Sequence, residues 1–400
     1  MKIGMILDKT FPPDPRVENE ALALISSGHE VFLFCLTYEK KAGNESFKGF
    51  EVVRYLSGKI EYKLSALSYT LPFYRIMMSK KITHFLATYD IEIIHVHDMV
   101  VADAVIEANK VFQLPMVLDL HENRPEIMKT YPHLKKFPGN LLISTKVWKD
   151  KEGLLVMKAD RTIVVTKEAK EELVNRLGIA EHKIVVVPNT VKRSFYNDFV
   201  EEKAILEKYK EKFVILYLGD TGLRRGLLSV IEALGIMAND TEIKKQVKLV
   251  IVGKNSSDPI LKKRVQELGI EQMVDFEGWQ DIALFPSYLN VADIGVSPLH
   301  RNLHHDTTYA NKLFQYMSFA IPVLVSDALA QKNLIEEVKS GLVHKEQDAT
   351  EIAEKIMTLF SDPDLSKKLG LNGKQFIEEK FCWEKVSGNL KELYLELEKP

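Results

Sequence analysis

The sequence has little of what marks secreted, membrane-spanning or nucleic-acid-binding proteins. Its two cysteines, Cys35 and Cys382, are too few for a disulfide framework, and both lie in apolar stretches, which favours buried reduced thiols. No apolar run is long enough to cross a bilayer, and the first segment turns polar at Asp8, so we expect no signal peptide. A net charge of −2 gives no general attraction to nucleic acid. We therefore expect a soluble cytoplasmic protein, at most peripheral on the inner face of the cell membrane.

The composition itself is that of an ordinary globular protein. Hydrophobic residues make up 46% and charged residues 28%, which argues against disorder. A chain of 400 residues is too long for one ordinary core, so its length predicts two or three domains. Neither a short internal repeat nor a low-complexity tract interrupts it.

Short apolar strands alternate with amphipathic helices along the first half of the chain. Pro15 suits the first position of a helix, and Gly28 suits its end. This alternation predicts a parallel, doubly wound α/β sheet. The expected strands are residues 2–7, 31–36, 91–96, 116–120, 162–166 and 184–187.

The same pattern restarts after a charged segment, 192–212, which we interpret as a linker. The expected strands of the second half are residues 213–218, 248–252, 274–276, 293–297 and 323–326. We expect domains at 1–195 and 196–380, followed by a helix in 381–400 that crosses back to the N-terminal domain. Ligands of such folds bind at the carboxyl ends of the strands, so we expect the chemistry in a cleft between the two sets of strand ends.

The stretch TTYANKLFQYMSFAIPVLVSD, residues 307–327, is the most informative motif. A polar run, 307–311, precedes an apolar-periodic helix, and the exposed N–H groups and dipole of a helix start suit a phosphate. Lys312 and Gln315, within the next turn, can reach a group attached to that phosphate. The motif predicts a nucleotide-diphosphate cradle without a Walker lysine or a GxGxxG loop.

Other polar residues follow predicted strands. Arg224 and Arg225, in the glycine-rich loop 219–226, suit phosphate oxygens, although Arg225 could also be a solvated cation at a helix start. Lys254, after Gly253, fits a ligand site and a plain turn equally well. In the first half, we expect His95 to be a core histidine and His121 to have a role in the cleft. For His97 the pattern fits either interpretation.

A family resemblance rests on the order and spacing of many blocks along nearly the whole chain. These blocks are PPDPRVENEALALISSGHEV, IIHVHD, DLHENRPE, ADRTIVVTKEAKEEL, VVVPNTV, YLGDTGLRRGL, VIVGK, VDFEGW, ADIGVSPL and ANKLFQYMSFAIPVLVSD. In them the chain resembles the retaining nucleotide-sugar glycosyltransferases of family 4, which have the GT-B fold of two Rossmann-like domains. Family members carry two acidic residues in the last block, and those positions fall here on Thr307 and Gln315.

The resemblance implies transfer of a sugar, with retained configuration, from a nucleoside-diphosphate sugar bound by the C-terminal domain to an acceptor at the N-terminal domain. No DxD-type pair follows a strand, so we expect no metal and no further cofactor. The acceptor would be a glycan or a polyprenyl-linked or other glycolipid of cell-surface synthesis. The implied catalytic residues are His121, Arg225 and Lys254, and the implied acceptor contact is Glu122. The implied donor-binding residues are Arg16, Gly222, Arg224, Gly253, Glu277, Thr307, Thr308, Tyr309, Asn311, Lys312 and Gln315.

Two functions of other classes stay open. A nucleotide-sugar epimerase shares this fold, but its chemistry normally needs carboxylate acid–base groups. A non-catalytic sugar-nucleotide binder fits the neutral residues Thr307 and Gln315.

Two segments of the N-terminal half, 59–81 and 128–149, are rich in both cations and apolar residues. They are either helical inserts with solvated lysines or a surface that docks on anionic lipid, as a lipid-linked acceptor would require. The cations of this predicted surface include Lys135, Lys136, Lys146 and Lys149.

Overall fold

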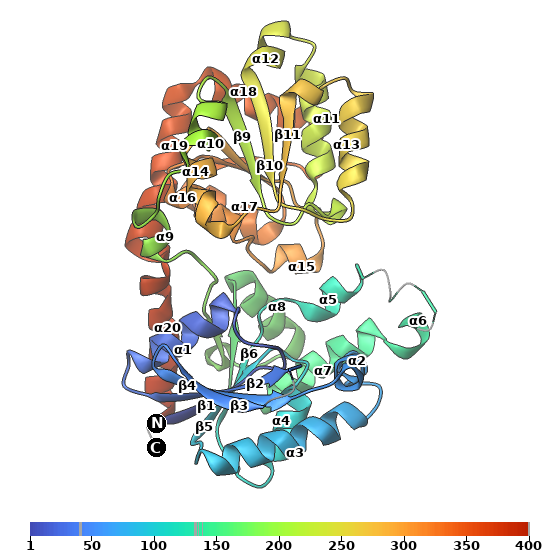
Figure 1. The fold of residues 1–400 in the computed structure, drawn as a ribbon, viewed down its shortest axis with the longest axis vertical. Coiled ribbons are helices and arrows are strands. Elements are labelled where there is room, and N and C mark those ends of the chain that lie inside the picture. The colour runs from blue at the N-terminus through green and yellow to red at the C-terminus, as the bar shows by residue number, and fades with distance from the viewer. Residues whose placement is uncertain (40–41, 132–133, 135, 138, 399–400) are drawn as a thin grey trace. The chain divides into compact units, whose positions relative to one another are not determined.

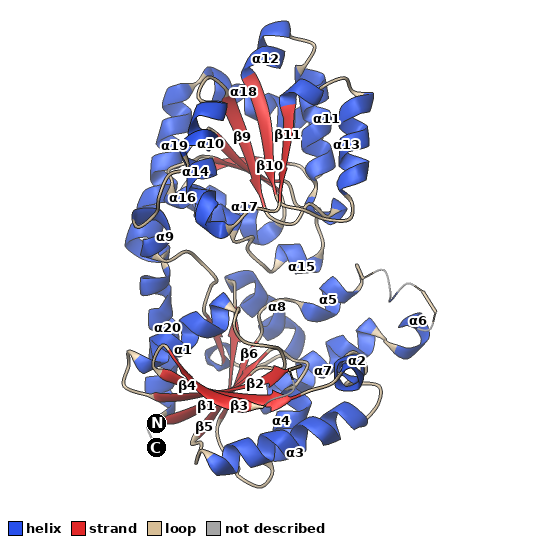
Figure 2. Ribbon diagram, in the orientation of Figure 1, coloured by secondary structure: helices blue, strands red, loops and turns tan. Residues whose placement is uncertain are grey.

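The computed structural model describes residues 1–39, 42–131, 134, 136–137 and 139–398. The chain divides into two compact units, one made of Met1–Pro188 with Ser387–Pro400 and the other of Asn189–Val386 (Figure 1). Each unit contains one sheet with helices on both faces (Figure 2).

The sheet of the first unit has the order β3-β4-β2-β1-β5-β6-β7-β8. All neighbouring strands are parallel except β3, which pairs antiparallel with β4. The expected strands include neither β3 nor β4: the GNESF segment of β3 is polar and almost wholly exposed, whereas the FEVVRYL segment of β4 is apolar and was overlooked. The strands are β1 (Lys2–Ile6), β2 (Glu30–Thr37), β3 (Gly43–Phe47), β4 (Phe50–Leu56), β5 (Ile93–His97), β6 (Met116–Asp119), β7 (Arg161–Val164) and β8 (Ile184–Val186).

The helices of the first unit cover both faces of this sheet. On one face, α3 and α4 bury side chains such as Met78 and Phe85 against Ile94 and Val96 of β5. On the other lies α1, whose N-cap Asp14 accepts a hydrogen bond from the Val17 N–H at 3.2 Å. The helices are α1 (Pro15–Ile25), α2 (Lys59–Ser65), α3 (Phe73–Thr88), α4 (Ala102–Asn109), α5 (Arg124–Met128), α6 (Gly139–Leu142), α7 (Thr145–Lys158) and α8 (Lys167–Leu177).

The sheet of the second unit is wholly parallel, with the order β11-β10-β9-β12-β13-β14. Five of its strands lie where the sequence predicts them. The sixth, β14, is a short GLVH segment that the pattern does not distinguish from a loop. The strands are β9 (Phe213–Leu218), β10 (Val247–Val252), β11 (Val274–Gly278), β12 (Ile294–Ser297), β13 (Val323–Ser326) and β14 (Gly341–His344).

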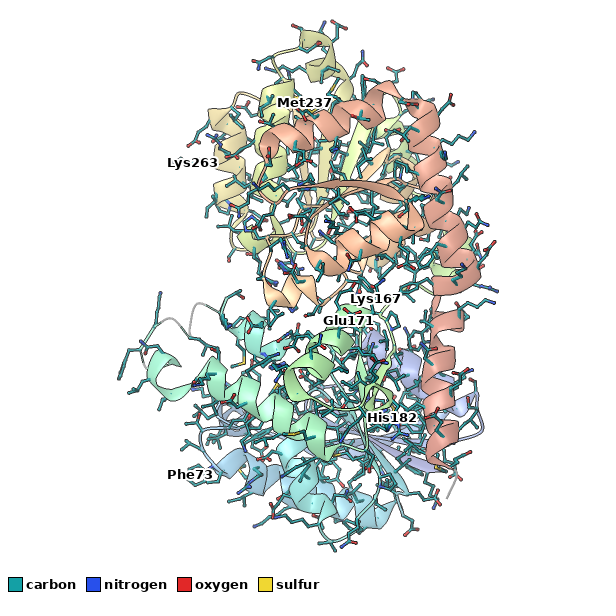
Figure 3. All side chains as sticks on the ribbon, turned by 180° about the vertical axis from the view of Figure 1, so that it is seen from behind. Phe73, Lys167, Glu171, His182, Met237 and Lys263 are labelled. Carbon is teal, nitrogen blue, oxygen red and sulfur yellow. The ribbon has the colours of Figure 1, made fainter. Side chains whose placement is uncertain are left out.

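Two apolar cores flank this second sheet. One is formed with α11, α13 and α18, and the other with α10, α14 and α16. Outer faces are polar, and Lys263 on α13 points away from the sheet (Figure 3). The helices are α9 (Arg193–Asn197), α10 (Lys203–Tyr209), α11 (Leu227–Met237), α12 (Thr241–Gln246), α13 (Asp258–Glu267), α14 (Phe285–Asn290), α15 (Leu303–Asp306), α16 (Lys312–Ser318), α17 (Leu329–Val338), α18 (Ala349–Ser361) and α19 (Pro363–Phe376).

Two segments join the units differently from a simple linker. Residues 192–212, expected as a linker, fold into α9 and α10 and belong to the second unit, where Tyr209 is buried. The last helix, α20 (Trp383–Leu397), begins in the second unit, and its residues from Ser387 onward belong to the first, where Tyr394 is buried. Throughout the described part of the chain, each helix is too short or too polar to cross a bilayer.

Candidate functional site

The carboxyl ends of β5 and β6 place several polar side chains on one face of the first sheet. Successive strand residues point to opposite faces, so Ile94 and Val96 pack in the α3–α4 core while His95 and His97 lie on the α1 side. In the β5–β6 register, His97 is opposite Asp119. All three of these polar side chains are fully buried, so each needs partners inside the protein.

Arg16, from the first turn of α1, supplies the main partner of Asp119. Its Nη2 and Nε lie 2.6 and 2.8 Å from the two Asp119 oxygens, a bidentate pair, and Nη2 also lies 2.9 Å from Glu20 Oε1. Burial would raise the pKa of Asp119, but the charges of Arg16 and then His121 outweigh it and hold that pKa well below its usual range. Arg16 also donates to the Val187 carbonyl at 3.1 Å. These contacts make Arg16 a counterion of buried carboxylates, and its predicted donor contact stays a prediction.

His121 lies at the edge of this buried group. Its Nε2 is 2.9 Å from Asp119 Oδ2 and 3.1 Å from His97 Nδ1, and 16% of its side chain is exposed. Burial lowers the pKa of His121, but the Asp119 charge raises it more, so the pKa ends above its ordinary value. The pKa of His97, by contrast, falls to about 4 through burial and then the neighbouring His95. Asp119 thus orients the His121 ring by Nε2 and leaves Nδ1 on the side away from this contact.

Glu122 and Arg124 follow His121 at the same edge. Arg124 Nη1 lies 2.7 Å from Asp98 Oδ2, and Asp98 also accepts the Met99 N–H at 2.7 Å. Burial and then the Asp98 charge raise the pKa of Glu122 above its ordinary value. The sequence analysis did not predict the Asp98–Arg124 pair, although an aspartate directly after a strand was a usable signal.

Four buried groups could offer ligand atoms to a metal ion. Atoms of Glu20, His95, His97 and Asp119 all lie within 4.8 Å of one another. The Arg16 guanidinium, however, contacts both carboxylates of the set. A divalent cation would therefore have to replace an existing positive charge, so the residues fit a metal poorly.

In the second unit, the loop after β9 gathers positive side chains around one carboxylate. Asp220 accepts hydrogen bonds from the Gly222 N–H at 3.1 Å and from Asn255 Nδ2 at 2.6 Å. Its Oδ2 also lies 3.4 Å from Arg224 Nη2 and 3.5 Å from Arg225 Nε. Asp220 and Asn255, which the sequence does not single out, therefore hold the loop and aim its two arginines.

Two glycines bring neighbouring loops into contact at this edge. Gly226 has a φ of +79°, and a Cβ there would lie 1.7 Å from the Pro298 carbonyl oxygen. Gly253 has a φ of +152°, and a Cβ there would lie 1.8 Å from the Gly219 carbonyl oxygen. Neither position accepts a side chain, so the loops after β9, β10 and β12 meet at backbone distance. Lys254, next to Gly253, is exposed beside them.

Lys312 is a buried cation of the same edge. Its Nζ lies 3.3 Å from the centroid of the Tyr217 ring, and no carboxylate contact to it is found within the described residues. Burial and then the charge of Arg225 hold the pKa of Lys312 well below its ordinary value, against the opposing effect of Asp220. Positive groups thus outnumber the single carboxylate here, which is the charge balance of an anion site.

The polar run 307–311 precedes α16, as predicted, and also follows a short helix, α15, that was not predicted. The Thr307 and Thr308 hydroxyls donate to the Leu303 and His304 carbonyls of α15 at 2.7 and 2.6 Å. Tyr309 packs edge-on against Phe314. The helix begins at Lys312, directly after the polar run as predicted, while the two threonine hydroxyls cap the preceding short helix.

The remaining predicted residues have mixed surroundings. Gln315 is partly exposed on α16, and Asn311 is exposed at its N-cap. The Glu277 carboxylate is engaged by Lys208 Nζ at 2.6 Å and by the Tyr209 and Tyr288 hydroxyls at 2.7 and 2.9 Å. Glu277 therefore ties β11 to α10 and α14, and we do not include it among the proposed donor contacts.

Two adjacent histidines complete this edge and were not predicted. His304 and His305 are buried, and burial followed by neighbouring positive charge lowers their pKa values to about 3 and about 4. The neighbouring charges include both Arg224 and Arg225. His305 Nδ1 lies 2.6 Å from the His300 carbonyl, so that nitrogen carries the proton of the neutral ring.

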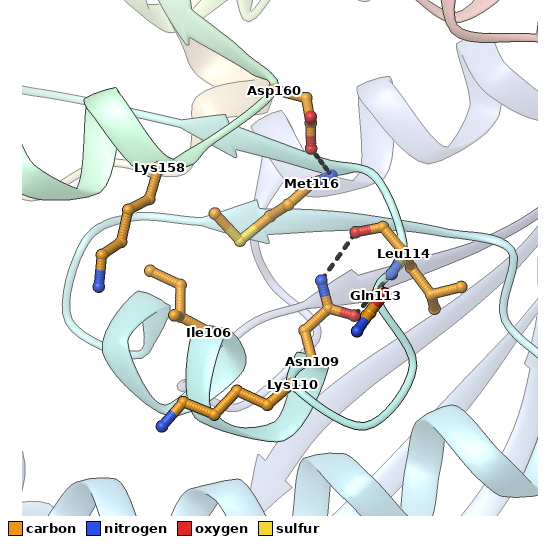
Figure 4. Close-up of a pocket in the computed structure, with 8 residues that line it drawn as sticks. All are labelled: Ile106, Asn109, Lys110, Gln113, Leu114, Met116, Lys158 and Asp160. Atoms are coloured by element: carbon orange, nitrogen blue, oxygen red, sulfur yellow. Dashed lines mark hydrogen bonds between the residues drawn. The ribbon is translucent and has the colours of Figure 1, made fainter.

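A pocket of about 320 Å³ lies at the opposite edge of the first sheet (Figure 4). Met116 and Asp160 line it where β6 and β7 begin, and the Met116 N–H donates to Asp160 at 2.7 Å. None of the predicted site residues lines this pocket.

Comparisons with known proteins agree with the two-unit division. The profile of "Glycosyl transferases group 1" matches residues 198–376, and that of "Glycosyltransferase Family 4" matches residues 16–195.

Individual relatives are distant. The chain is 20% identical to an alpha-D-kanosaminyltransferase of Streptomyces kanamyceticus over 72% of each chain. It is 22% identical to the capsular polysaccharide biosynthesis glycosyltransferase CapM of Staphylococcus aureus over 61% of this chain and 63% of CapM. Among solved structures, Anabaena HepE in complex with UDP has a TM-score of 0.72 at 15% identity, covering 99% of this chain and 100% of HepE.

The buried ion pair of the first unit leads to a stability prediction. Asp119→Asn removes the charge that compensates Arg16, and we expect a loss of about 3–5 kcal/mol in the free energy of unfolding, measured by urea titration at pH 7. Because the folded pKa of Asp119 is lowered, its contribution is present above the unfolded pKa and is lost as pH falls through the folded one. The difference between wild type and variant should therefore shrink in strong acid.

Asp160→Asn is the matched control, since Asp160 is exposed at the amino end of the neighbouring strand. We expect it to cost no more than about 1 kcal/mol. Equal losses for the two variants would contradict the buried-pair interpretation.

Proposed function

Because this chain belongs to the glycosyltransferases of family 4 and has their GT-B fold, we propose that it moves a hexosyl group, with retained anomeric configuration, from a nucleoside-diphosphate sugar to a glycan or lipid-linked acceptor. The first unit would bind the acceptor and the second the donor. A role in cell-surface polysaccharide or glycolipid synthesis is supported by the printed function of CapM in capsular polysaccharide biosynthesis.

The observation that carries this proposal is the uncompensated positive charge beside the loop after β9. Among the described residues, Asp220 is the carboxylate found beside Arg225 and Lys312. A nucleoside diphosphate would supply the missing negative charge, and the HepE complex with UDP supports this ligand class. Departure of the diphosphate builds further charge on its oxygens, which preorganised cations stabilise.

Each donor contact then has a chemical task. Arg225, Lys254 and Lys312 stabilise the leaving diphosphate, whose charge raises the depressed pKa of Lys312. The Gln315 side-chain oxygen accepts a hydrogen bond from a ribose hydroxyl, where other family members use a carboxylate. Gly222, Gly253, Thr307, Thr308, Tyr309 and Asn311 complete the proposed donor surroundings.

His121 is the proposed catalytic residue of the first unit. Asp119 holds its Nε2, so Nδ1 is the atom available to donate a hydrogen bond to the transferred sugar. Glu122, next to it, is the proposed acceptor contact. Because cationic side chains take the charge of the leaving group, we propose that transfer needs no metal ion.

An assay with nucleotide sugars and a polyprenyl-diphosphate-linked sugar tests the reaction class. Nucleotide release that depends on the acceptor supports transfer. An epimerised sugar would show an epimerase, and binding without turnover would show a non-catalytic binder. Two observations favour binding without turnover as the alternative. Thr307 caps α15, and Gln315 is neutral at a position where other family members have an acid.

Arg225→Ala is expected to cripple transfer without unfolding the protein. The variant loses charge-assisted bonds made in the transition state, which should cost about 2–4 kcal/mol, or roughly 30-fold to 1,000-fold in kcat/KM. Arg264→Ala on α13, which removes a partly exposed arginine of the same unit, should leave kcat/KM unchanged. Unchanged kinetics in Arg225→Ala would remove this residue from the mechanism.

Lys312 should take up a proton when nucleotide binds. Its pKa is depressed in the free protein, and a diphosphate beside it raises that pKa, so affinity should fall as pH rises. Calorimetry with UDP at pH 8, in two buffers of different ionisation enthalpy, should show net proton uptake. Lys312→Met should abolish that uptake, and Lys367→Met, at an exposed lysine of α19, should keep it. Buffer-independent heats in the wild type would contradict the assignment.

A surface of the first unit fits the lipid-linked acceptor. Ile60 and Tyr62 on α2, Phe137, and Leu141 on α6 are 73%, 67%, 80% and 76% exposed. The α2–α3 connection touches α6, where the Thr70 hydroxyl donates to the Leu142 carbonyl at 2.7 Å. Exposed lysines lie among these apolar groups, the pattern of a protein that binds at a membrane interface.

Some residues predicted for this surface do not belong to it. Trp148 and Tyr74 are both 2% exposed, so they pack inside the unit. Lys149 pairs with Glu152 at 2.7 Å and is not available to lipid. Lys135 lies outside the described residues.

We propose that this surface binds the anionic inner face of the cell membrane. Vesicle co-sedimentation tests this proposal. We expect binding to anionic but not neutral liposomes and its loss at high salt, since each lysine near such a surface contributes about 1 kcal/mol. Replacing Lys63, Lys136 and Lys146 by Glu should abolish binding. The same change at Lys367, Lys368 and Lys380 of the second unit should not. A wild type that binds no vesicle would indicate a soluble acceptor.

A further inference from the structure

The face of the first sheet that holds Asp119 also receives a side chain from the last helix of the chain. Tyr394 of α20 places its hydroxyl 2.8 Å from His95 Nδ1, across 299 residues of sequence. Both side chains are fully buried, and their rings lie nearly parallel, 6° apart in plane. The contact therefore couples the C-terminal helix to the polar group beneath the proposed catalytic histidine.

We propose that Tyr394 and His95 are positioning residues that set the charge on His121 through Asp119. The proposal rests on the proposed function for the role of His121 in catalysis, while the coupling itself rests on the geometry. The coupling has three links. The first is the Tyr394–His95 hydrogen bond, the second is the contact of His95 with the Asp119 carboxylate, and the third is the 2.9 Å contact between Asp119 and His121.

His95 is built to carry a positive charge. Its Nε2 lies 3.2 Å from Glu20 Oε2 and 3.9 Å from Asp119 Oδ2, while its Nδ1 faces the Tyr394 hydroxyl. The imidazolium thus has an ion-pair contact with Glu20 at Nε2 and a hydrogen-bond partner, the Tyr394 hydroxyl, at Nδ1. Burial lowers the pKa of His95, but hydrogen bonds to Asp119 and Glu20 outweigh it and raise the pKa to about 9.

The two histidines share one carboxylate, so their charges oppose each other. The charged or titratable groups that face His95 are Glu20 of α1, His97 of β5, Asp119 of β6 and Tyr394 of α20, and Arg16 contacts both of these carboxylates. Those that act on His121 are Asp119, His97, Arg16 and Asp98. A proton on His95 partly compensates Asp119 and therefore disfavours a proton on His121.

The Tyr394 hydroxyl favours the protonated form of His95. Without it, the Nδ1 proton of the imidazolium would be buried with no acceptor, which costs more than leaving the lone pair of a neutral ring without a donor. Tyr394→Phe should therefore lower the pKa of His95. With less positive charge beside Asp119, the pKa of His121 should rise. His95→Gln should produce the larger rise, because it removes the charge altogether.

Histidine-selective NMR titration of the whole protein measures these shifts directly. The sequence has 11 histidines, and the His121 and His95 signals are assigned by their loss in His121→Gln and His95→Gln. We expect the His121 midpoint to rise by about 0.5 unit or more in His95→Gln and by less in Tyr394→Phe. The His95 midpoint should fall in Tyr394→Phe.

Tyr55→Phe is the matched control. It removes a tyrosine–histidine hydrogen bond of the same kind, 3.0 Å from Tyr55 to His84 Nδ1, at the surface of the same unit. The control should leave His121 unmoved. An unchanged or lowered His121 midpoint in both His95→Gln and Tyr394→Phe would overturn the proposal.

The pH profile of kcat/KM for nucleotide release separates this coupling from the proposed catalytic role. A profile that shifts with the His121 midpoint supports both. A His121 midpoint that moves in the NMR titration while the profile stays fixed keeps the coupling and removes His121 from the reaction. A purely structural role for Tyr394 would lower activity at every pH without displacing either curve.

Discussion

The bidentate ion pair between Arg16 and Asp119 is the interaction on which the polar edge of the first unit depends. A buried carboxylate is costly unless a charge compensates it, and Arg16 supplies that charge from the first turn of α1. With Asp119 ionised, His121 has a fixed hydrogen-bond partner and a raised pKa. His95 and Tyr394 then occupy the remaining polar contacts of the same face. One ion pair thus allows a cluster of titratable groups inside an otherwise apolar sheet.

In the second unit, by contrast, the positive side chains near Asp220 are not fully compensated by carboxylates among the described residues. Arg225 and Lys312 lie near one partly exposed carboxylate, Asp220, which is also occupied with Asn255 and with its own loop. The cost of this imbalance appears as the depressed pKa of Lys312. The proposed diphosphate ligand would relieve that cost. The buried charges of the first unit are therefore compensated within the protein, whereas the second unit keeps an excess of positive charge near Asp220.

Sequence patterns were sufficient for most of the fold. Strands β9 and β13 begin and end at the predicted residues, because buried parallel strands are uninterrupted apolar runs bounded by polar loops. Strand β3 was missed, since the exposed edge segment GNESF carries no apolar alternation, whereas β4, FEVVRYL, was missed although it is apolar. The family and the GT-B fold inferred by resemblance are confirmed. That the two polar edges face each other across a cleft stays a prediction.

Site residues were less predictable, because position along the chain does not say what a side chain touches. Sequence alone determined that Arg224, Arg225 and His121 follow strand ends and that Lys312 lies at a helix start, since parallel strands align their carboxyl ends at one edge. Only the tertiary structure showed that Thr307 caps α15 and that Glu277 is held by two tyrosines. It alone also joined Tyr394 to His95, because a contact across 299 residues is decided by packing and by the need to satisfy buried polar atoms.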